Sequence, residues 1–122
     1  MARPGGDDRG YVTAEMATAL PVLVVLLAVA LSAVGAVTAQ LRCVDAAREG
    51  ARAAARGESI ARVTSLAGQA APPGAKVGVR AAGAGLVAVS VTSRVPLLGH
   101  LLAPVTVRGR AVALKEPVGA GP

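Results

Sequence analysis

The sequence predicts an α+β fold: a long N-terminal transmembrane helix continues into an amphipathic stalk helix, and a small three-stranded antiparallel β-sheet follows. Three observations predict this order. The 26 residues from Met16 to Leu41 carry no charge. An Ala- and Arg-rich segment of helical period comes next, and beyond residue 75 apolar residues recur at every second position, as in strands. The expected segments are a leader at 1–10, a transmembrane helix at 11–41, a stalk at 42–70, a β head at 75–115 and a flexible tail at 116–122.

The first ten residues are expected to form a polar leader without regular structure, because a proline and three glycines, Gly10 among them, oppose it. The uncharged run behind it is long enough to cross a bilayer. As a helix it would span about 39 Å, against about 30 Å for the hydrocarbon core. Pro21 has no N–H to donate to the carbonyl of Ala17, so we expect a helix kink at this proline.

The helix is expected to continue past the bilayer with a stripe of small apolar residues, which would cover one face of the sheet. Charged residues follow on another face, where Glu49 can pair with Arg52, or Asp45 with Arg48. The stripe consists of Leu41, Val44, Ala47, Ala51 and Ala54.

A short second helix is expected at the end of the stalk. Gly57 is predicted to break the first helix, and Ser59 to cap a segment that has Ile60, Val63 and Ala67 on one face. The two prolines and the glycine of QAAPPGAK then end helical structure.

Three strands are predicted at 76–80, 86–95 and 105–114, joined by the loops AAGAG and PLLGHLLAP. In each strand, apolar residues alternate with polar ones, which is the pattern of an antiparallel sheet covered on one side. The expected apolar face contains Val77, Val79, Val87, Val89, Val91, Val95, Val105, Val107, Ala111 and Ala113.

The start of the uncharged run carries a family resemblance. Gly10 is followed five positions later by Glu15 and then by the apolar helix, which resembles the class III signal of type IV pilin-like proteins. The stretch VTAEMATALPVLVVLL is similar to the start of the TadE-like minor pilins (pseudopilins) of tight-adherence (Tad/Flp) pili, and RCVDAAREGARAAARGE to the stalk of their actinobacterial versions. The resemblance covers about residues 9–58. It departs from the major pilins at Met16, where these have a tyrosine.

This resemblance implies that a prepilin peptidase cuts between Gly10 and Tyr11. It also implies that Glu15 takes part in subunit association by pairing with the new α-amine of a neighbouring subunit. The implied product is a non-enzymatic, single-pass protein of the cytoplasmic membrane, with its C-terminal part extracytoplasmic, or a subunit of a cell-surface pilus. Its partners would be the membrane, other pilins, pilus assembly platform proteins and the peptidase.

Two other interpretations of the helix stay open. Glu15 can simply mark the membrane boundary. The run can also be a secretory signal peptide cut near Ala39, which would release a small soluble protein; against this, it is longer than the usual 7–15 apolar residues. The arginine count conflicts with the implied orientation, because five arginines lie between Arg42 and Arg62 and only two precede the helix.

Other functions find little support in the composition. The chain has 122 residues and a net charge of +6, but a single aromatic residue, so its basic residues lack the aromatic interleaving typical of nucleic-acid binding. His100 is the only histidine and Cys43 the only cysteine, and neither has a visible catalytic or metal-binding partner. An internal disulfide is excluded. We expect no cofactor, metal, nucleic acid or small-molecule substrate.

Overall fold

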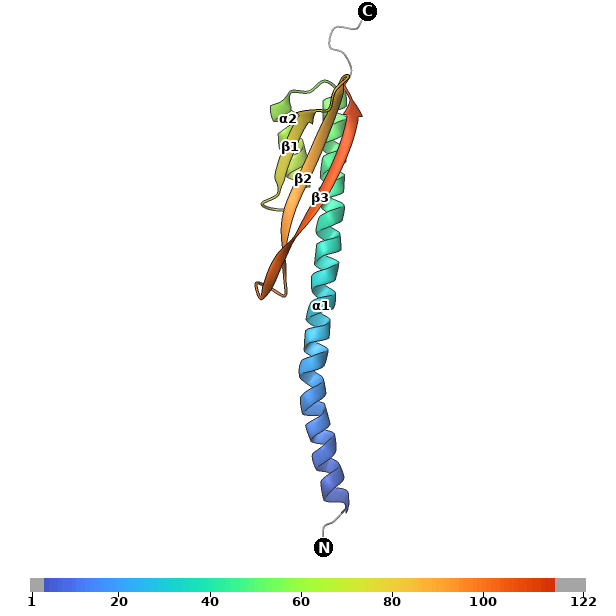
Figure 1. Cartoon of the computed structure of the whole chain (residues 1–122), viewed down its shortest axis with the longest axis vertical. Helices are drawn as coiled ribbons and strands as arrows, with labels where there is room; N and C mark the ends of the chain where they lie inside the picture. Colours follow the sequence, from blue (N-terminus) through green and yellow to red (C-terminus); the bar gives the residue numbers. More distant parts are fainter. Residues whose placement is uncertain (1–3, 116–122) are drawn as a thin grey trace, which may run out of the picture.

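The fold consists of one long helix with a small α+β head packed along its C-terminal half (Figure 1). The computed structural model describes the backbone of residues 4–115 and the side chains of residues 10–115. The predicted tail at 116–122 and the start of the leader lie outside the described residues. The fold class predicted from the sequence is confirmed. The elements are α1 (Pro4–Ala55), α2 (Ile60–Ala70), β1 (Lys76–Ala81), β2 (Leu86–Leu97) and β3 (Leu102–Leu114).

Helix α1 begins earlier than the sequence suggested. The leader was expected to lack regular structure, yet its residues from Pro4 onward are helical and continuous with the apolar run. The reason is positional, since a proline in the first turn of a helix gives up only an N–H that has no intrahelical acceptor. Whether residues 1–10 are removed as a leader stays a prediction.

The three strands form one antiparallel sheet in the order β1-β2-β3. The register pairs Val77 with Val91 and Val89 with Ala111, so the predicted apolar faces of the strands coincide. The second hairpin is longer than predicted. Most of PLLGHLLAP continues the strands, with Leu97 opposite Leu102. Only Leu98–Leu101 forms the turn, and a register shift between Val95 and Leu97 accommodates Pro96.

The core lies between α1 and one face of the sheet, and small residues make it possible. Gly50 is buried, and a Cβ there would lie 2.8 Å from Cγ1 of Val89. A Cβ at Gly109 would meet the backbone of Cys43, so β3 lies almost directly on the helix. Most of the predicted stripe is buried, whereas Leu41 is 60% exposed. The buried apolar residues are Cys43, Ala46, Ala47, Ala51, Ala53, Ala54, Val63, Ala67, Ala88, Val89, Val91 and Val107.

Helix α2 packs beside the end of α1 instead of extending the stalk. The Ser59 hydroxyl caps it by accepting a hydrogen bond from the backbone N–H of Arg62 at 3.2 Å. Of the three residues predicted to share one face, Val63 and Ala67 are buried in the cluster that includes Ala51, Ala53 and Ala54 of α1, and Ile60 is 68% exposed. The first position of the helix lies at the rim of the head, so only the later turns reach the core.

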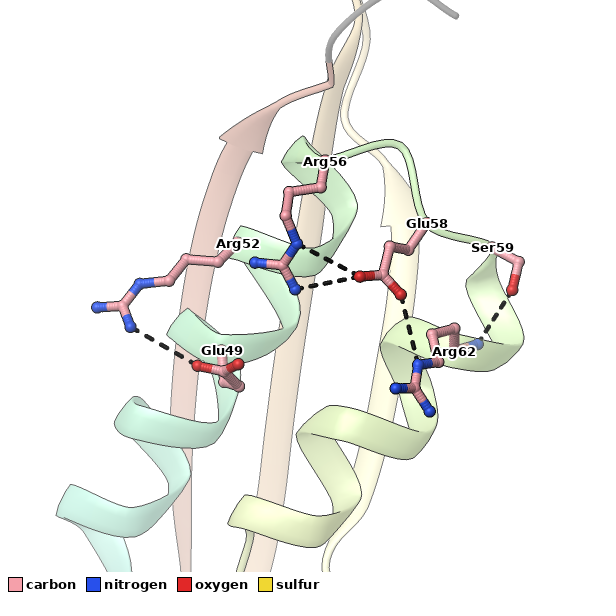
Figure 2. A network of polar contacts seen from close by, with 6 residues as sticks. All are labelled: Glu49, Arg52, Arg56, Glu58, Ser59 and Arg62. Carbon is pink, nitrogen blue, oxygen red and sulfur yellow. Dashed lines mark hydrogen bonds and ion pairs between the residues drawn. The ribbon is translucent and has the colours of Figure 1, made fainter.

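Glu58 links the two helices at the turn between them (Figure 2). Its carboxylate accepts hydrogen bonds from Arg56, just after α1, and forms an ion pair with Arg62 in α2; the ion-pair distances are 3.2 and 3.4 Å. The predicted Glu49–Arg52 pair is present at 3.6 Å. Within the described part of the chain, the alternative pair of Asp45 with Arg48 does not form. These pairs are exposed, so each is worth no more than about 1 kcal/mol.

Candidate membrane-spanning and subunit-contact segment

Helix α1 has two halves with opposite surroundings. In the bare half, residues 10–31, the side chains are exposed, apart from Ala28, which is half-buried. In the covered half, residues 32–55, half-buried or buried positions recur at steps of three and four from Ser32 onward. The exposed large apolar residues of the bare half are Tyr11, Val12, Met16, Leu20, Val22, Leu23, Val24, Val25, Leu26, Leu27, Val29 and Leu31.

The bare half has the composition of a membrane span. The most apolar 18-residue window of α1 has a mean hydropathy of 2.7, and none of it is buried within the chain. The core helix of a soluble protein would be covered, and this one is not. A signal sequence near the N-terminus would look the same by this measure. Apolar surface of this extent on every side of a helix calls for lipid or neighbouring helices around it.

The predicted processing and contact residues lie together at the N-terminal end of the bare half. Tyr11 is 77% exposed, and Glu15 follows one turn later, also exposed. Among the described residues, Glu15 takes part in no hydrogen bond or ion pair. A Cβ at Gly10 would meet nothing within 4 Å, so packing inside this chain does not explain the glycine.

Pro21 lies inside α1, which continues through it. Just before it, the Thr18 hydroxyl donates to the carbonyl of Ala14 at 3.0 Å. The proline leaves the carbonyl of Ala17 without its usual helical donor. The predicted kink stays a prediction, and Figure 1 shows a continuous ribbon through this part of the helix.

Two polar side chains inside the uncharged run dock the head, and the sequence pattern did not predict either contact. The amide of Gln40 donates to the carbonyl of Arg108 at 2.7 Å and accepts from its N–H at 3.0 Å, as a neighbouring strand would. The hydroxyl of Ser32 accepts from the N–H of Leu98 at 3.0 Å. Both contacts join residues more than 60 positions apart, so no local pattern of the sequence indicates them.

Cys43 is fully buried beneath Gly109 of β3. Burial raises the pKa of its thiol above 9.0 by removing water from the charged form. A neutral, covered thiol is a poor nucleophile and cannot reach a second subunit. The structure therefore places Cys43 in the packing between helix and sheet and gives no support to a cross-link.

Other candidate groups for chemistry lie apart. His100 is exposed in the turn between β2 and β3. Within the described residues, no three His, Cys, Asp or Glu side chains gather where they could hold a metal ion. The feature that stands out is the bare half of α1, an apolar surface that the described chain does not cover.

Comparison with known proteins agrees with this geometry. The family model described as TadE-like protein matches residues 10–52, which begin at Gly10 and include the bare half. The curated protein named apoptosis inhibitor Rv3655c, from Mycobacterium tuberculosis, is 41% identical over 103 residues, covering 84% of this chain and 78% of its own. No solved structure matches.

Proposed function

The chain belongs to the TadE-like family, and on that premise we propose that it is a minor pilin that takes part in assembling a tight-adherence type IV pilus. It would act without catalysis, as a single-pass membrane protein that presents one helix to other pilins. The observation that carries this proposal is the bare half of α1. It displays large apolar side chains on all sides, while the head covers one face of the rest of the helix.

The edge of the bare half supports assembly with other subunits. Cleavage after Gly10 by a prepilin peptidase would leave a cationic α-amine on Tyr11, one turn from Glu15. In low dielectric the attraction between opposite charges is several times stronger than in water. A carboxylate at the hydrocarbon edge is costly without such a partner. The amine of a neighbouring subunit would satisfy Glu15 and set the axial position of the incoming helix.

The orientation proposed puts the head outside the cytoplasmic membrane, against the simple arginine count. Of the arginines that follow the run, Arg52, Arg56 and Arg62 belong to the ion pairs of Figure 2. They are part of a folded head that is translocated as a unit, and long translocated segments follow the charge rule weakly.

The contacts of the covered half weigh against a secretory signal peptide cut near Ala39. Such a cut would remove Ser32, which holds the turn after β2. It would also make Gln40 the first residue. The side chain of Gln40 forms two hydrogen bonds with the backbone of Arg108 in β3. Ala39 itself lies within α1 and is half-buried. The cleavage would thus remove one hydrogen-bonded contact of the head, while the buried residues of α1 from Cys43 onward would stay.

Glu15→Ala tests the proposed subunit contact. The variant is expected to insert, since a charge is removed from the hydrocarbon edge, but to lose association with partner pilins and to reduce piliation. Glu15→Asp keeps the charge on a shorter side chain and is expected to recover part of the function. Glu49→Ala, which removes a partly exposed carboxylate from the covered half, is the matched control. Co-purification with partner pilins and counts of pili supply the readout. Wild-type association of the Glu15→Ala variant would show that Glu15 only marks the membrane boundary.

Gly10→Val tests the processing site independently. A peptidase that reaches the bond before a membrane helix needs backbone free of a Cβ, so this variant is expected to insert and keep its ten leader residues. Gly35→Val is the control, because Gly35 also lies in α1 and a Cβ added there would meet nothing within 4 Å. Normal processing of the Gly10 variant would contradict the assignment.

A further inference from the structure

The turn between β2 and β3 contains Leu101, the most exposed large apolar residue among those described. We define the β2–β3 tip as residues 97–102, LLGHLL. Leu101 is 86% exposed and Leu102 52%. Leu98 has a φ of 49°, in the left-handed region that side chains other than glycine rarely adopt. Such a turn favours Gly, Asn or Asp. The backbone conformation of the turn therefore gives no reason for the leucines found there.

The tip lies beside the uncharged run of α1. The N–H of Leu98 donates to the hydroxyl of Ser32 at 3.0 Å, and Ser32 precedes Arg42, the first charge after the run, by ten residues. A hydrocarbon core of about 30 Å that starts after Glu15 takes up roughly 20 helical residues and ends near Gly35. Ser32 then lies about 4.5 Å inside that edge, at 1.5 Å per residue. In Figure 1 the tip is the part of the head that extends farthest along α1 toward the bare half.

The charges around the tip fit an anionic bilayer surface. From Ser59 to Lys115 the sequence contains no acidic residue. Arg94 in β2 and Arg108 in β3 are exposed on the strands that lead to the tip, and Arg42 is exposed where the apolar run ends. Basic residues at this depth are attracted to anionic lipid headgroups. An apolar end bordered by basic residues is the pattern of segments that lie in the interface, about 5–10 Å deep.

We propose that the β2–β3 tip inserts into the membrane leaflet that borders the head, so that the chain contacts the bilayer at two points. Leu101 and Leu102 enter the acyl region, the imidazole of His100 lies at the headgroups, and Arg94 faces the lipid phosphates. The Leu98–Ser32 hydrogen bond fixes the depth of the tip relative to the helix. This inference rests on the proposed membrane span, but holds for either orientation of the chain.

Contact with the bilayer at two points would fix the rotation and the tilt of α1, which a single span leaves free. A single span can rotate about its own axis and tilt. With the tip also in the leaflet, one face of α1 is turned toward the tip, and the opposite face of the bare half is presented to neighbouring subunits.

Tryptophan fluorescence can test the proposal cleanly, because the chain contains no Trp. The full chain carrying Leu101→Trp is reconstituted in phosphatidylcholine–phosphatidylglycerol vesicles whose acyl chains are brominated at a shallow or a deep position. We expect a blue-shifted emission that the shallow bromines quench more strongly than the deep ones. Leu26→Trp, near the middle of the proposed span, reports on that span and should be quenched most by the deep bromines. Leu114→Trp is the matched control, a leucine 65% exposed at the opposite end of β3, and should not be quenched.

The variants separate the possible failures. Quenching of Leu26→Trp without quenching of Leu101→Trp would overturn the tip proposal and leave the span intact. A blue-shifted but unquenched Leu101→Trp would mean that protein, such as a second copy, covers the tip, and would also overturn it. Quenching of neither would overturn both the span and the tip. In each variant, Cys43 should stay protected from maleimide. The sheet is what buries this thiol, so its protection shows that the head is still packed on α1.

Discussion

The two halves of α1 are equally helical but use different apolar residues. The bare half is rich in Leu and Val, which stay exposed, and the covered half is rich in Ala, most of which is buried or half-buried. In the bare half, large side chains form a wide apolar surface that no other part of the described chain covers. Small ones bring a sheet so close that β3 touches the helix backbone at Gly109. Side-chain size along one helix therefore separates the surface for external partners from the surface for internal packing.

A charge in the bare half should produce the largest effect. Leu26→Arg puts a guanidinium near the middle of the apolar run, where an insertion scale gives about 3 kcal/mol against the membrane. We expect much less protein in the membrane fraction. Leu114→Arg, at an exposed leucine of the head, is the control and should leave the fraction unchanged. Equal membrane fractions for both variants would mean that the bare half has no lipid around it.

Gly109→Val should damage the covered half almost as much. The new Cβ would meet the backbone of Cys43 and Val44, which cannot move aside as a flexible side chain can, and we expect a loss of about 3 kcal/mol. The measurement is the rate of maleimide reaction at Cys43, which should rise as the sheet leaves the helix. Gly68→Ala, in an open position of α2, should leave that rate low and add up to about 1 kcal/mol of stability.

The cap of α2 should have a smaller effect. Ser59→Ala removes the acceptor for the N–H of Arg62 and should cost about 1 kcal/mol in the free energy of unfolding of the head. Ser65→Ala, an exposed serine within the same helix, is the control and should be neutral or slightly stabilising. Thermal unfolding followed by circular dichroism would distinguish the two. Equal losses for both variants would refute the role assigned to the cap.

The Cys43 thiol should give the smallest effect at neutral pH and a growing one in alkali. Its pKa is raised in the folded chain, so above about pH 9 the unfolded chain releases this proton first, and the stability of the folded state falls as pH rises. Below that pH both states keep the proton and the contribution is constant. The test is the difference between wild type and Cys43→Ala, which isolates the contribution of this thiol. Parallel stability curves for the two would contradict burial of the thiol.

The sequence predicted the elements well because periodicity reports directly on which face of an element is covered. The apolar run, the Ser59 cap and the alternating valines of β2 each gave one clear signal, and the structure agrees. Apart from the early start of α1, what the sequence did not predict were contacts between distant segments. Nothing local shows that Ser32 receives the N–H of Leu98, or that Gln40 joins β3. The proposed partners of Glu15 lie outside this chain, so neither the sequence nor the fold alone identifies them.

The mature N-terminus of the protein isolated from membranes tests the central claim most directly. This claim is that the bare half of α1 remains in the mature protein as a processed membrane span. Mass spectrometry should find Tyr11 as the first residue. Gln40 at that position would mean that the bare half is a discarded signal peptide, and an intact Met1 or Ala2 would mean that no peptidase acts at Gly10. Either result would contradict the account.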